Sequence, residues 1–357
     1  MRPLLLGLCL LGACTSPAPP VAPADLGLVA TSTQVVDPRR PVHRSYDVMG
    51  TQMTLTAFTA DEAKAVLAFD DAYREMKRLE DLLTVWKPDS DVSRINAAAG
   101  NGVGVKVQPE TMECLRLAVH FAQLTGGKFD PTFGALSGLW RFDHDQDNVI
   151  PDRTQVRKRL KLIDYRQLTL DEATQSAKLE RPGMKLHLGG IGKGYAVDKT
   201  VALLRARGFQ DFMVQAGGDL YVAGTRGPRA WRVGIRDPRG PPSSYFAASE
   251  VTDASFSTSG DYERAFLKDG VRYHHILDPA TGNPAMACRS VTIMAKDAVT
   301  ADGISKGVFI LGPEKGLALV EAIDGAGAVI VDRNNQVHLS KRLEGRVKLL
   351  HPPTPGP

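Results

Sequence analysis

Cysteine is scarce in this sequence. Only four of the 357 residues are cysteine, and two of these, Cys9 and Cys14, lie close to the amino terminus. The folded part of the chain therefore contains only Cys114 and Cys288. The surrounding patterns predict that both are small buried apolar residues, and the sequence leaves open whether they form a disulfide.

Clusters of basic and aromatic residues are also missing. The formal net charge is only +4, aromatic residues make up 6% of the chain, and the lysines and arginines are scattered. This distribution argues against a nucleic-acid-binding surface. The hydrophobic content of 43% and charged content of 24% are ordinary for a soluble globular protein, and the length suits one large domain or two intertwined ones.

Several common catalytic signatures are absent. No Gly-x-Ser-x-Gly occurs, so a serine nucleophile has no strand-to-helix elbow. A Walker loop needs Ser or Thr after its Gly-Lys, whereas Gly194 follows Lys193, and the glycines at 190, 192 and 194 do not match the dinucleotide-binding spacing. The histidines are too scattered for a zinc site.

The amino terminus has the pattern of an export signal. Arg2 precedes a short apolar run at 4–11, which is too short to span a bilayer. The following Leu-Gly-Ala-Cys resembles the lipobox of bacterial lipoproteins, so we expect a signal peptide over 1–13 and lipidation of Cys14. An ordinary cleaved signal with a chance cysteine is the alternative. No aspartate follows Cys14 directly, so nothing argues for inner-membrane retention. The expected location is the periplasmic face of a bacterial membrane.

Proline-rich segments flank the expected domain. Residues 14–40 form a predicted tether and residues 346–357 a predicted tail, which leaves 41–345 as the folded domain. Within it, long helical patterns alternate with strand patterns, which predicts an α+β fold. Helices are expected at 61–83, 109–125, 193–207, 300–311 and 314–323, with a short one after 152; strands are expected at 46–55 (interrupted by a glycine), 212–215, 220–223, 231–235, 249–253, 255–259, 273–277, 290–294 and 327–331.

A glycine-rich turn at 189–194 separates an apolar run from an amphipathic segment. Glycines allow a ligand close to the backbone, and the free N–H groups at a helix start attract anions such as phosphate. A packing turn without a ligand explains the same residues.

Three further segments carry polar residues beside apolar runs. Segment 257–264 is a hydroxyl-rich turn or a ligand loop, and segment 301–307 places Asp302 at a helix start, where an acidic residue is usually a cap. In segment 274–282, strand alternation puts only one of His274 and His275 on the inner face. That histidine is either an acid–base group near neutral pH or a structural residue.

Taken together and in order, these motifs resemble the bacterial FAD:protein FMN transferases, the ApbE-like family once labelled thiamine biosynthesis lipoproteins. The resemblance covers roughly residues 44–335. Its most specific parts are Gly-Gly-Ile-Gly-Lys-Gly-Tyr-Ala-Val-Asp at 189–198 and His-Ile-Leu-Asp-Pro-Ala-Thr-Gly at 275–282. The other matching segments are 49–51, 87–96, 127–131, 217–219, 258–264 and 301–302.

The resemblance implies a fold and a reaction. The fold is two-lobed α+β, related to the T-fold, with FAD in the cleft and magnesium bridging the pyrophosphate. FMN is transferred to a Thr or Ser hydroxyl of a partner redox protein of the FMN-binding-domain type, and AMP is released. Positioning and charge neutralisation carry most of the catalysis in such chemistry.

The resemblance also implies roles for individual residues. Asp302 is the catalytic metal carboxylate, the backbone at Gly190 offers a carbonyl, Ser305 is a further metal ligand, and His275 is the general base. The residues that would line the FAD site are Met49, Asn96, Phe129, Asp130, Gly190, Lys193, Thr258, Asp261 and His275.

Two positions depart from the family pattern. Lys306 stands where the family usually has Thr, and an ammonium group cannot ligate magnesium. Either Lys306 neutralises phosphate directly, or Ser305 takes the place of the Thr ligand. His187 stands where Asp is common. Both changes make the local charge more positive. An FAD pyrophosphatase that yields FMN and AMP, and a flavin-binding lipoprotein without catalysis, are therefore the alternative functions.

Overall fold

The computed structural model describes residues 37–142 and 145–356. The predicted signal peptide, Cys14 and nearly all of the tether lie outside these residues. The contacts divide the chain into Met1–Asp37 and Pro38–Pro357, and only the second unit is described below. Among the described residues, no helix combines the length and apolar character needed to cross a bilayer.

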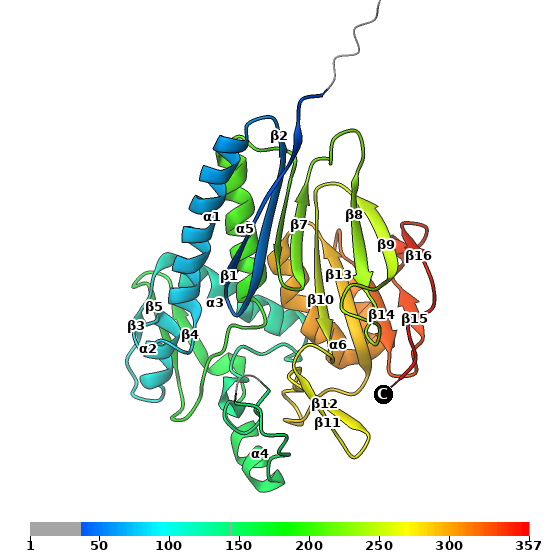
Figure 1. Ribbon diagram of the computed structural model, residues 1–357. Helices are drawn as coiled ribbons and strands as arrows, with labels where there is room; N and C mark the ends of the chain where they lie inside the picture. Colours follow the sequence, from blue (N-terminus) through cyan, green and yellow to red (C-terminus); the bar gives the residue numbers. More distant parts are fainter. Residues whose placement is uncertain (1–36, 143–144, 357) are drawn as a thin grey trace, which may run out of the picture. The chain divides into compact units, whose positions relative to one another are not determined.

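An antiparallel sheet forms the centre of this unit (Figure 1). It has eight strands, and every neighbouring pair runs antiparallel. In spatial order the strands are β1 (Arg40–Val48), β2 (Thr51–Thr59), β6 (Phe212–Ala216), β7 (Asp219–Ala223), β10 (Ala254–Gly260), β13 (Cys288–Ala295), β14 (Gly327–Asp332) and β15 (Val337–Leu339).

Three long helices pack on one face of the sheet: α1 (Glu62–Leu83), α5 (Gly192–Ala206) and α6 (Ala298–Glu321). Helix α1 forms because its apolar residues recur every three or four positions, and Asp61 caps it by accepting a bond from the Lys64 N–H at 2.9 Å. Its stripe is fully buried, and each large side chain such as Phe69 stabilises the fold by about 1.5–3 kcal/mol.

The opposite face of the sheet is covered by a second, smaller sheet. Its strands are β8 (Trp231–Arg236), β9 (Tyr245–Val251) and β16 (Val347–Leu349), in the order β16-β9-β8. Successive side chains of a strand point to opposite faces of the sheet, so β7 contributes to two hydrophobic cores. Tyr221 packs in the core between the sheet and the helices, and Val222 packs in the core between the two sheets.

The remaining elements form a smaller part beside the sheet's lower end in Figure 1. They are helices α2 (Asp91–Ala97), α3 (Pro109–Leu124) and α4 (Arg153–Leu160), a sheet of β3 (Val105–Lys106), β5 (Ser176–Leu179) and β4 (Leu168–Asp171), and the hairpin of β11 (Ala265–Lys268) and β12 (Val271–His274). Three short 3-10 turns lie at Gly134–Leu136, Tyr165–Gln167 and Lys341–Leu343.

The α+β prediction is confirmed, and most helices and strands fall within a few residues of the expected bounds. The two helices expected in 300–323 appear as α6 with a kink, because Gly312 has φ of 78° and Pro313 follows it. Cys114 and Cys288 are buried free thiols.

Three expectations differ from the structure. The single strand at 46–55 is a hairpin instead, since Met49 (φ 54°) and Gly50 (φ 67°) form a two-residue turn with both φ values positive. The strand expected at 273–277 ends at His274. The expected tail at 346–357 is packed on the fold: β16 pairs with β9, and Asp237 accepts bonds from the Thr354 N–H and hydroxyl.

Candidate functional site

The glycine-rich turn leads directly into helix α5. Its approach is held by Asn96, whose amide accepts from the Leu186 N–H at 2.6 Å and donates to the Leu186 carbonyl at 3.0 Å. The Asn96 side chain thus makes the pair of hydrogen bonds that the backbone of a neighbouring strand would make with Leu186. Ile191 is the N-cap of α5 and makes no side-chain capping bond; the Gly192 N–H donates to the Leu188 carbonyl at 2.8 Å, and N–H groups of this first turn find partners elsewhere in the fold.

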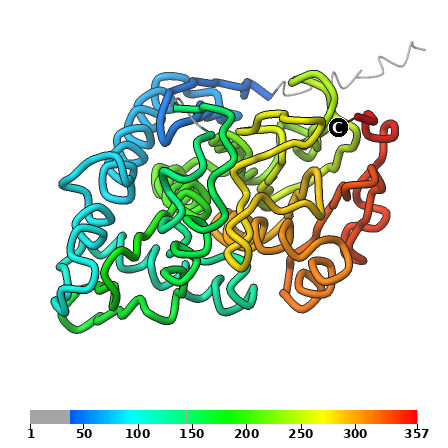
Figure 2. Tube along the Cα trace, turned by 90° about the horizontal axis from the view of Figure 1, so that it is seen from below, coloured from blue at the N-terminus to red at the C-terminus, as the bar shows by residue number. Residues whose placement is uncertain are grey.

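The partner of one of these N–H groups is Asp302, at the start of α6. The Gly194 N–H donates to Asp302 Oδ2 at 3.0 Å. The helices approach so closely that a Cβ on Gly194 would lie 2.4 Å from the Ala298 carbonyl oxygen and 2.6 Å from Asp302 Cβ. Gly194 is therefore required for packing, and the same packing brings a buried carboxylate to the positive end of α5. Figure 2 shows α5 in green beside α6 in orange.

Asp302 is fully buried, and both of its carboxylate oxygens have partners. Oδ1 forms an ion pair with the ammonium of Lys306, one helical turn away, and Oδ2 takes the bond from Gly194. The Lys306 ammonium is also 3.3 Å from the Asp302 main-chain oxygen. Ser305 donates to that oxygen at 2.9 Å, and its hydroxyl lies 2.9 Å from the Ser259 hydroxyl.

A second buried carboxylate, Asp219, lies at the start of β7. Asp219 Oδ2 is 3.0 Å from the Lys193 ammonium, and Ser257 donates to its Oδ1 at 2.5 Å. Burial raises the pKa of Asp219, but the charges of Lys193 and Lys306 outweigh it and hold the pKa below its usual value. Burial likewise opposes the charge of Lys193, while Asp219 and Asp302 raise its pKa above the usual value. These two carboxylates and two lysines, hereafter the lysine–aspartate cluster, act electrostatically as one group.

His275 lies beside this cluster, and His274 does not take part in it. His274 is a structural residue, since its Nε2 bonds to the Ala285 carbonyl at 2.8 Å and its Nδ1 accepts from the Ile276 N–H at 3.3 Å. His275 Nδ1 is buried and finds no hydrogen-bond partner among the described residues. Burial, followed by the charges of His274, Arg264, Lys306 and Lys193, lowers the pKa of His275 to about 3. Its imidazole is neutral at pH 7.

Other predicted site residues reach the same region through backbone and apolar contacts. Phe129 is buried, and a Cβ on Gly190 would lie 3.0 Å from its ring and 3.9 Å from Lys306 Cδ. The Thr258 hydroxyl is hydrogen-bonded to the Thr292 hydroxyl at 2.9 Å. The Thr258 carbonyl oxygen lies so close to Gly218 that a Cβ on Gly218 would be only 2.7 Å from it. The structure therefore gathers one set of the predicted residues: Phe129, Gly190, Lys193, Thr258, His275, Asp302 and Ser305.

Asp130 and Asp261 hold their own loops instead. Asp130 accepts from the Thr132 hydroxyl and N–H and from the Tyr165 N–H. Asp261 forms a two-bond ion pair with Arg239, with both distances 2.7 Å and both side chains more than nine-tenths buried. Both carboxylates are hydrogen-bonded to other residues of the chain, and the roles predicted for them in FAD binding stay predictions.

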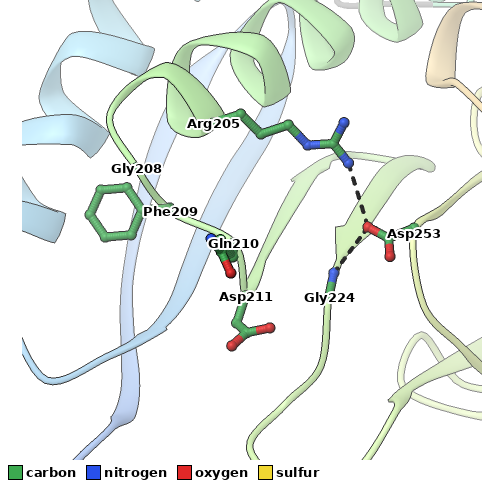
Figure 3. Close-up of a pocket in the computed structure, with 7 residues that line it drawn as sticks. All are labelled: Arg205, Gly208, Phe209, Gln210, Asp211, Gly224 and Asp253. Carbon is green, nitrogen blue, oxygen red and sulfur yellow. Dashed lines mark hydrogen bonds and ion pairs between the residues drawn. The ribbon is translucent and has the colours of Figure 1, made fainter.

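Met49 lies at the tip of the β1–β2 hairpin. Its N–H donates to Glu80 Oε1 at 2.9 Å, and the hairpin borders a hollow of about 490 Å³ lined in part by Gly50, Thr51 and Lys77. The hairpin also reaches the Gly217–Gly218 turn, because a Cβ on Gly217 would lie 2.7 Å from Thr51 Oγ1. A separate hollow of about 400 Å³ near Arg205 and Asp253, shown in Figure 3, has none of the predicted site residues in its lining.

Asp219 is the site residue that the sequence reasoning missed. The signal was the preceding Gly217-Gly218, because a glycine pair before a strand allows two segments to approach closely. What the sequence could not show is that Lys193, from a helix start, would be its partner.

Comparisons with known proteins show the family of this chain. The sequence matches the model of the ApbE family over residues 49–330. An FAD:protein FMN transferase of Treponema pallidum (strain Nichols) is 34% identical over 327 residues, which cover 87% of this chain and 90% of that relative. One of Klebsiella pneumoniae (strain 342) is 34% identical, with coverage of 82% and 90%.

Solved structures show the same fold. The ApbE protein from Thermotoga maritima superposes with a TM-score of 0.78 at 31% identity, covering 86% of this chain and 99% of that one. The flavin transferase ApbE from Vibrio cholerae gives a TM-score of 0.76 at 27% identity, with the same coverage. The resemblance seen in the motifs is confirmed, and the chain belongs to the ApbE family.

Proposed function

We propose that this protein is an FAD:protein FMN transferase, which moves FMN from FAD to a Thr or Ser hydroxyl of a partner redox protein. Relatives with this name align along most of their length with this chain. The observation that carries the proposal is the lysine–aspartate cluster at the start of α5, with a neutral histidine beside it. Cations at the positive end of a helix suit a pyrophosphate, and a neutral imidazole suits the uptake of a proton.

The reaction is a phosphoryl-type transfer. The oxygen of the acceptor hydroxyl forms a bond to the phosphorus of the FMN half, the bond from that phosphorus to the bridging oxygen breaks, and AMP leaves with the bridging oxygen. The proton of the hydroxyl goes to the neutral imidazole of His275, whose Nδ1 has no hydrogen-bond partner among the described residues. The pKa of about 3 belongs to the protein without substrate, and the negative pyrophosphate beside the ring would raise it.

Magnesium is the part of the prediction that the residues present do not fit. Both carboxylate oxygens of Asp302 have partners, and the Ser305 hydroxyl already takes part in two hydrogen bonds. The Lys306 ammonium, a positive charge, lies beside these expected metal ligands. Among the described residues, no three His, Cys, Asp or Glu side chains are grouped as metal ligands.

The location of the protein is a proposal from the amino terminus alone. The lipobox-like sequence at 11–14 supports lipidation of Cys14 and attachment to a bacterial membrane on its periplasmic side. The tether that follows would leave the enzyme free to reach an acceptor protein of the FMN-binding-domain type.

A single assay separates the candidate functions. The purified protein is mixed with FAD and an acceptor domain, and the products are analysed for AMP and for a fluorescent protein band that survives denaturation. A covalent band with AMP is the expected result, and an acceptor whose Thr or Ser is replaced by Ala should give no band. AMP with free FMN would instead identify an FAD pyrophosphatase, and intact bound FAD would identify a flavin-binding protein without catalysis.

A further inference from the structure

We infer that the Lys306 ammonium takes the place of a divalent cation at Asp302, so that this protein binds the pyrophosphate of FAD without a metal. The part of this inference that concerns binding stands apart from the proposed function, and the part that concerns transfer rests on it. It starts from the disagreement described above, in which the residues expected to hold magnesium are already engaged.

The position of Lys306 is fixed by the packing of α6. Gly303 and Gly307 let α3 lie directly against α6, since a Cβ on them would be 2.3 Å from Phe121 Cδ2 and 2.4 Å from Thr125 Cγ2. With the rotation of α6 fixed in this way, the side chains four residues apart, Asp302 and Lys306, meet on one side of the helix. The Lys306 stem also passes close to Gly190, where a Cβ would be 3.9 Å from its Cδ.

Lys306 is placed to contact a ligand as well as Asp302. Its side chain is 19% exposed whereas the Asp302 side chain is fully buried, so part of the lysine side chain reaches the open side of the pair. An ammonium has three donors, and its contacts with the carboxylate and the main-chain oxygen of Asp302 leave one donor for a phosphate oxygen. Lys193 is likewise 25% exposed while its partner Asp219 is 3% exposed. Both lysines therefore lie between a buried carboxylate and the open side.

The charge balance explains why no further cation is needed. The lysine–aspartate cluster has two positive and two negative groups, so it is neutral before a ligand binds. Without Lys306 the same cluster would carry a net negative charge and would repel a pyrophosphate until a cation joined it. A divalent ion arriving at Asp302 in the native protein would have to displace the ammonium and lie beside its charge, which opposes metal binding.

Binding measurements test this inference without any transfer. FAD is titrated into the purified protein in excess EDTA and again in excess magnesium, and binding is followed by the change in flavin fluorescence. We expect the two dissociation constants to agree within about twofold. In Lys306→Thr we expect affinity in EDTA to fall about tenfold or more, as for loss of a hydrogen bond to a charged group, and magnesium to restore it. Calorimetric titration with magnesium chloride alone should detect binding to Lys306→Thr and none to the native protein.

Two variants serve as controls. Lys306→Arg keeps the positive charge and should remain independent of magnesium. Lys315→Thr removes an exposed lysine farther along α6 and should behave as the native protein. Native protein that binds FAD only with magnesium, or that takes up magnesium alone, would overturn the inference, and this result does not depend on how any variant folds.

The transfer assay keeps the two proposals separate. If the native protein modifies the acceptor only when magnesium is present, the proposed function holds and the part of the inference that concerns transfer fails. If it binds FAD equally with and without magnesium but neither releases AMP nor labels the acceptor, the inference holds and the proposed function fails.

Discussion

Single residues decide the chemistry of this site, and the pairing of Asp302 with Lys306 is the clearest case. Asp302 has no exposed surface, and it is the partner of both the Lys306 ammonium and the Gly194 N–H. Removing one member of a buried ion pair leaves a charge without compensation, which costs more than the pair itself contributes.

We therefore expect Asp302→Ala to lower the free energy of unfolding by about 3 kcal/mol, at the low end for a buried pair because Lys306 keeps some access to water. Urea unfolding measures this loss. The double variant Asp302→Ala, Lys306→Met should recover part of the stability, since no charge is left unpaired. If the double variant is no more stable than the single one, the ion pair is not the cause.

His275 gives the protein a predicted sensitivity to acid. Its folded-state pKa of about 3 lies below the ordinary value of 6.5, so the unfolded chain binds more protons between these two pH values. Stability is complete above pH 6.5 and falls as the pH drops toward 3. Buried His274, whose pKa is also lowered by burial, acts in the same direction.

When the pH is lowered from 7 to 5, the free energy of unfolding should fall in the native protein. We expect this loss to be smaller by about 2 kcal/mol in His275→Asn. Urea unfolding at the two pH values measures it, and the exposed His351 provides the control variant His351→Asn, which should follow the native protein. Equal losses in native and His275→Asn proteins would mean that His275 is not held neutral by the fold.

At the scale of helices and strands, local patterns predicted most elements, and contacts between distant segments explain the errors. Helix α1 was predictable because its periodicity, its Asp61 cap and its end all lie within one segment. The β1–β2 hairpin was not, because Met49 is an unusual residue for a turn position with positive φ. Asn96 was expected to line the FAD site, and its bonds to Leu186, 90 residues away, appear only in the folded structure.

The crossing of α5 and α6 at Gly194 gives a prediction at this scale. A Cβ in Gly194→Ala would overlap the Ala298 carbonyl and Asp302 Cβ, so the helices must separate. We expect a loss of about 1–3 kcal/mol in unfolding free energy and weaker FAD binding, because Asp302 moves away from the start of α5. Thermal unfolding and FAD titration measure the two effects.

Gly192→Ala is the matched control for this prediction. It lies in the same turn of α5, and the nearest atom to its added Cβ would be Leu83 Cδ1 at 4.0 Å. We expect little change in stability or FAD affinity. Equal damage from both substitutions would show that the helix start, and not its contact with α6, is what the glycine preserves.

At the scale of the whole molecule, the site joins segments that are far apart in the sequence. Lys193 comes from α5, Asp219 from β7, His275 from the segment after β12 and Lys306 from α6. A ligand that contacts Lys193, His275 and Lys306 binds the folded chain and not the unfolded one, so it stabilises the entire fold. At a concentration 100 times its dissociation constant, FAD should add about 2.7 kcal/mol.

For a folded unit of this size, we expect that energy to raise the melting temperature by about 3–6 °C. For the native protein, the rise in melting temperature should be the same in EDTA and in magnesium, because the Lys306 ammonium takes the place of the metal ion. In Lys306→Thr at the same FAD concentration, a tenfold loss of affinity should cut the rise to about half in EDTA, and magnesium should restore it. A reductant should change none of these melting temperatures, since Cys114 and Cys288 are free thiols. A native protein that FAD stabilises only in the presence of magnesium would show that the ammonium does not replace the cation.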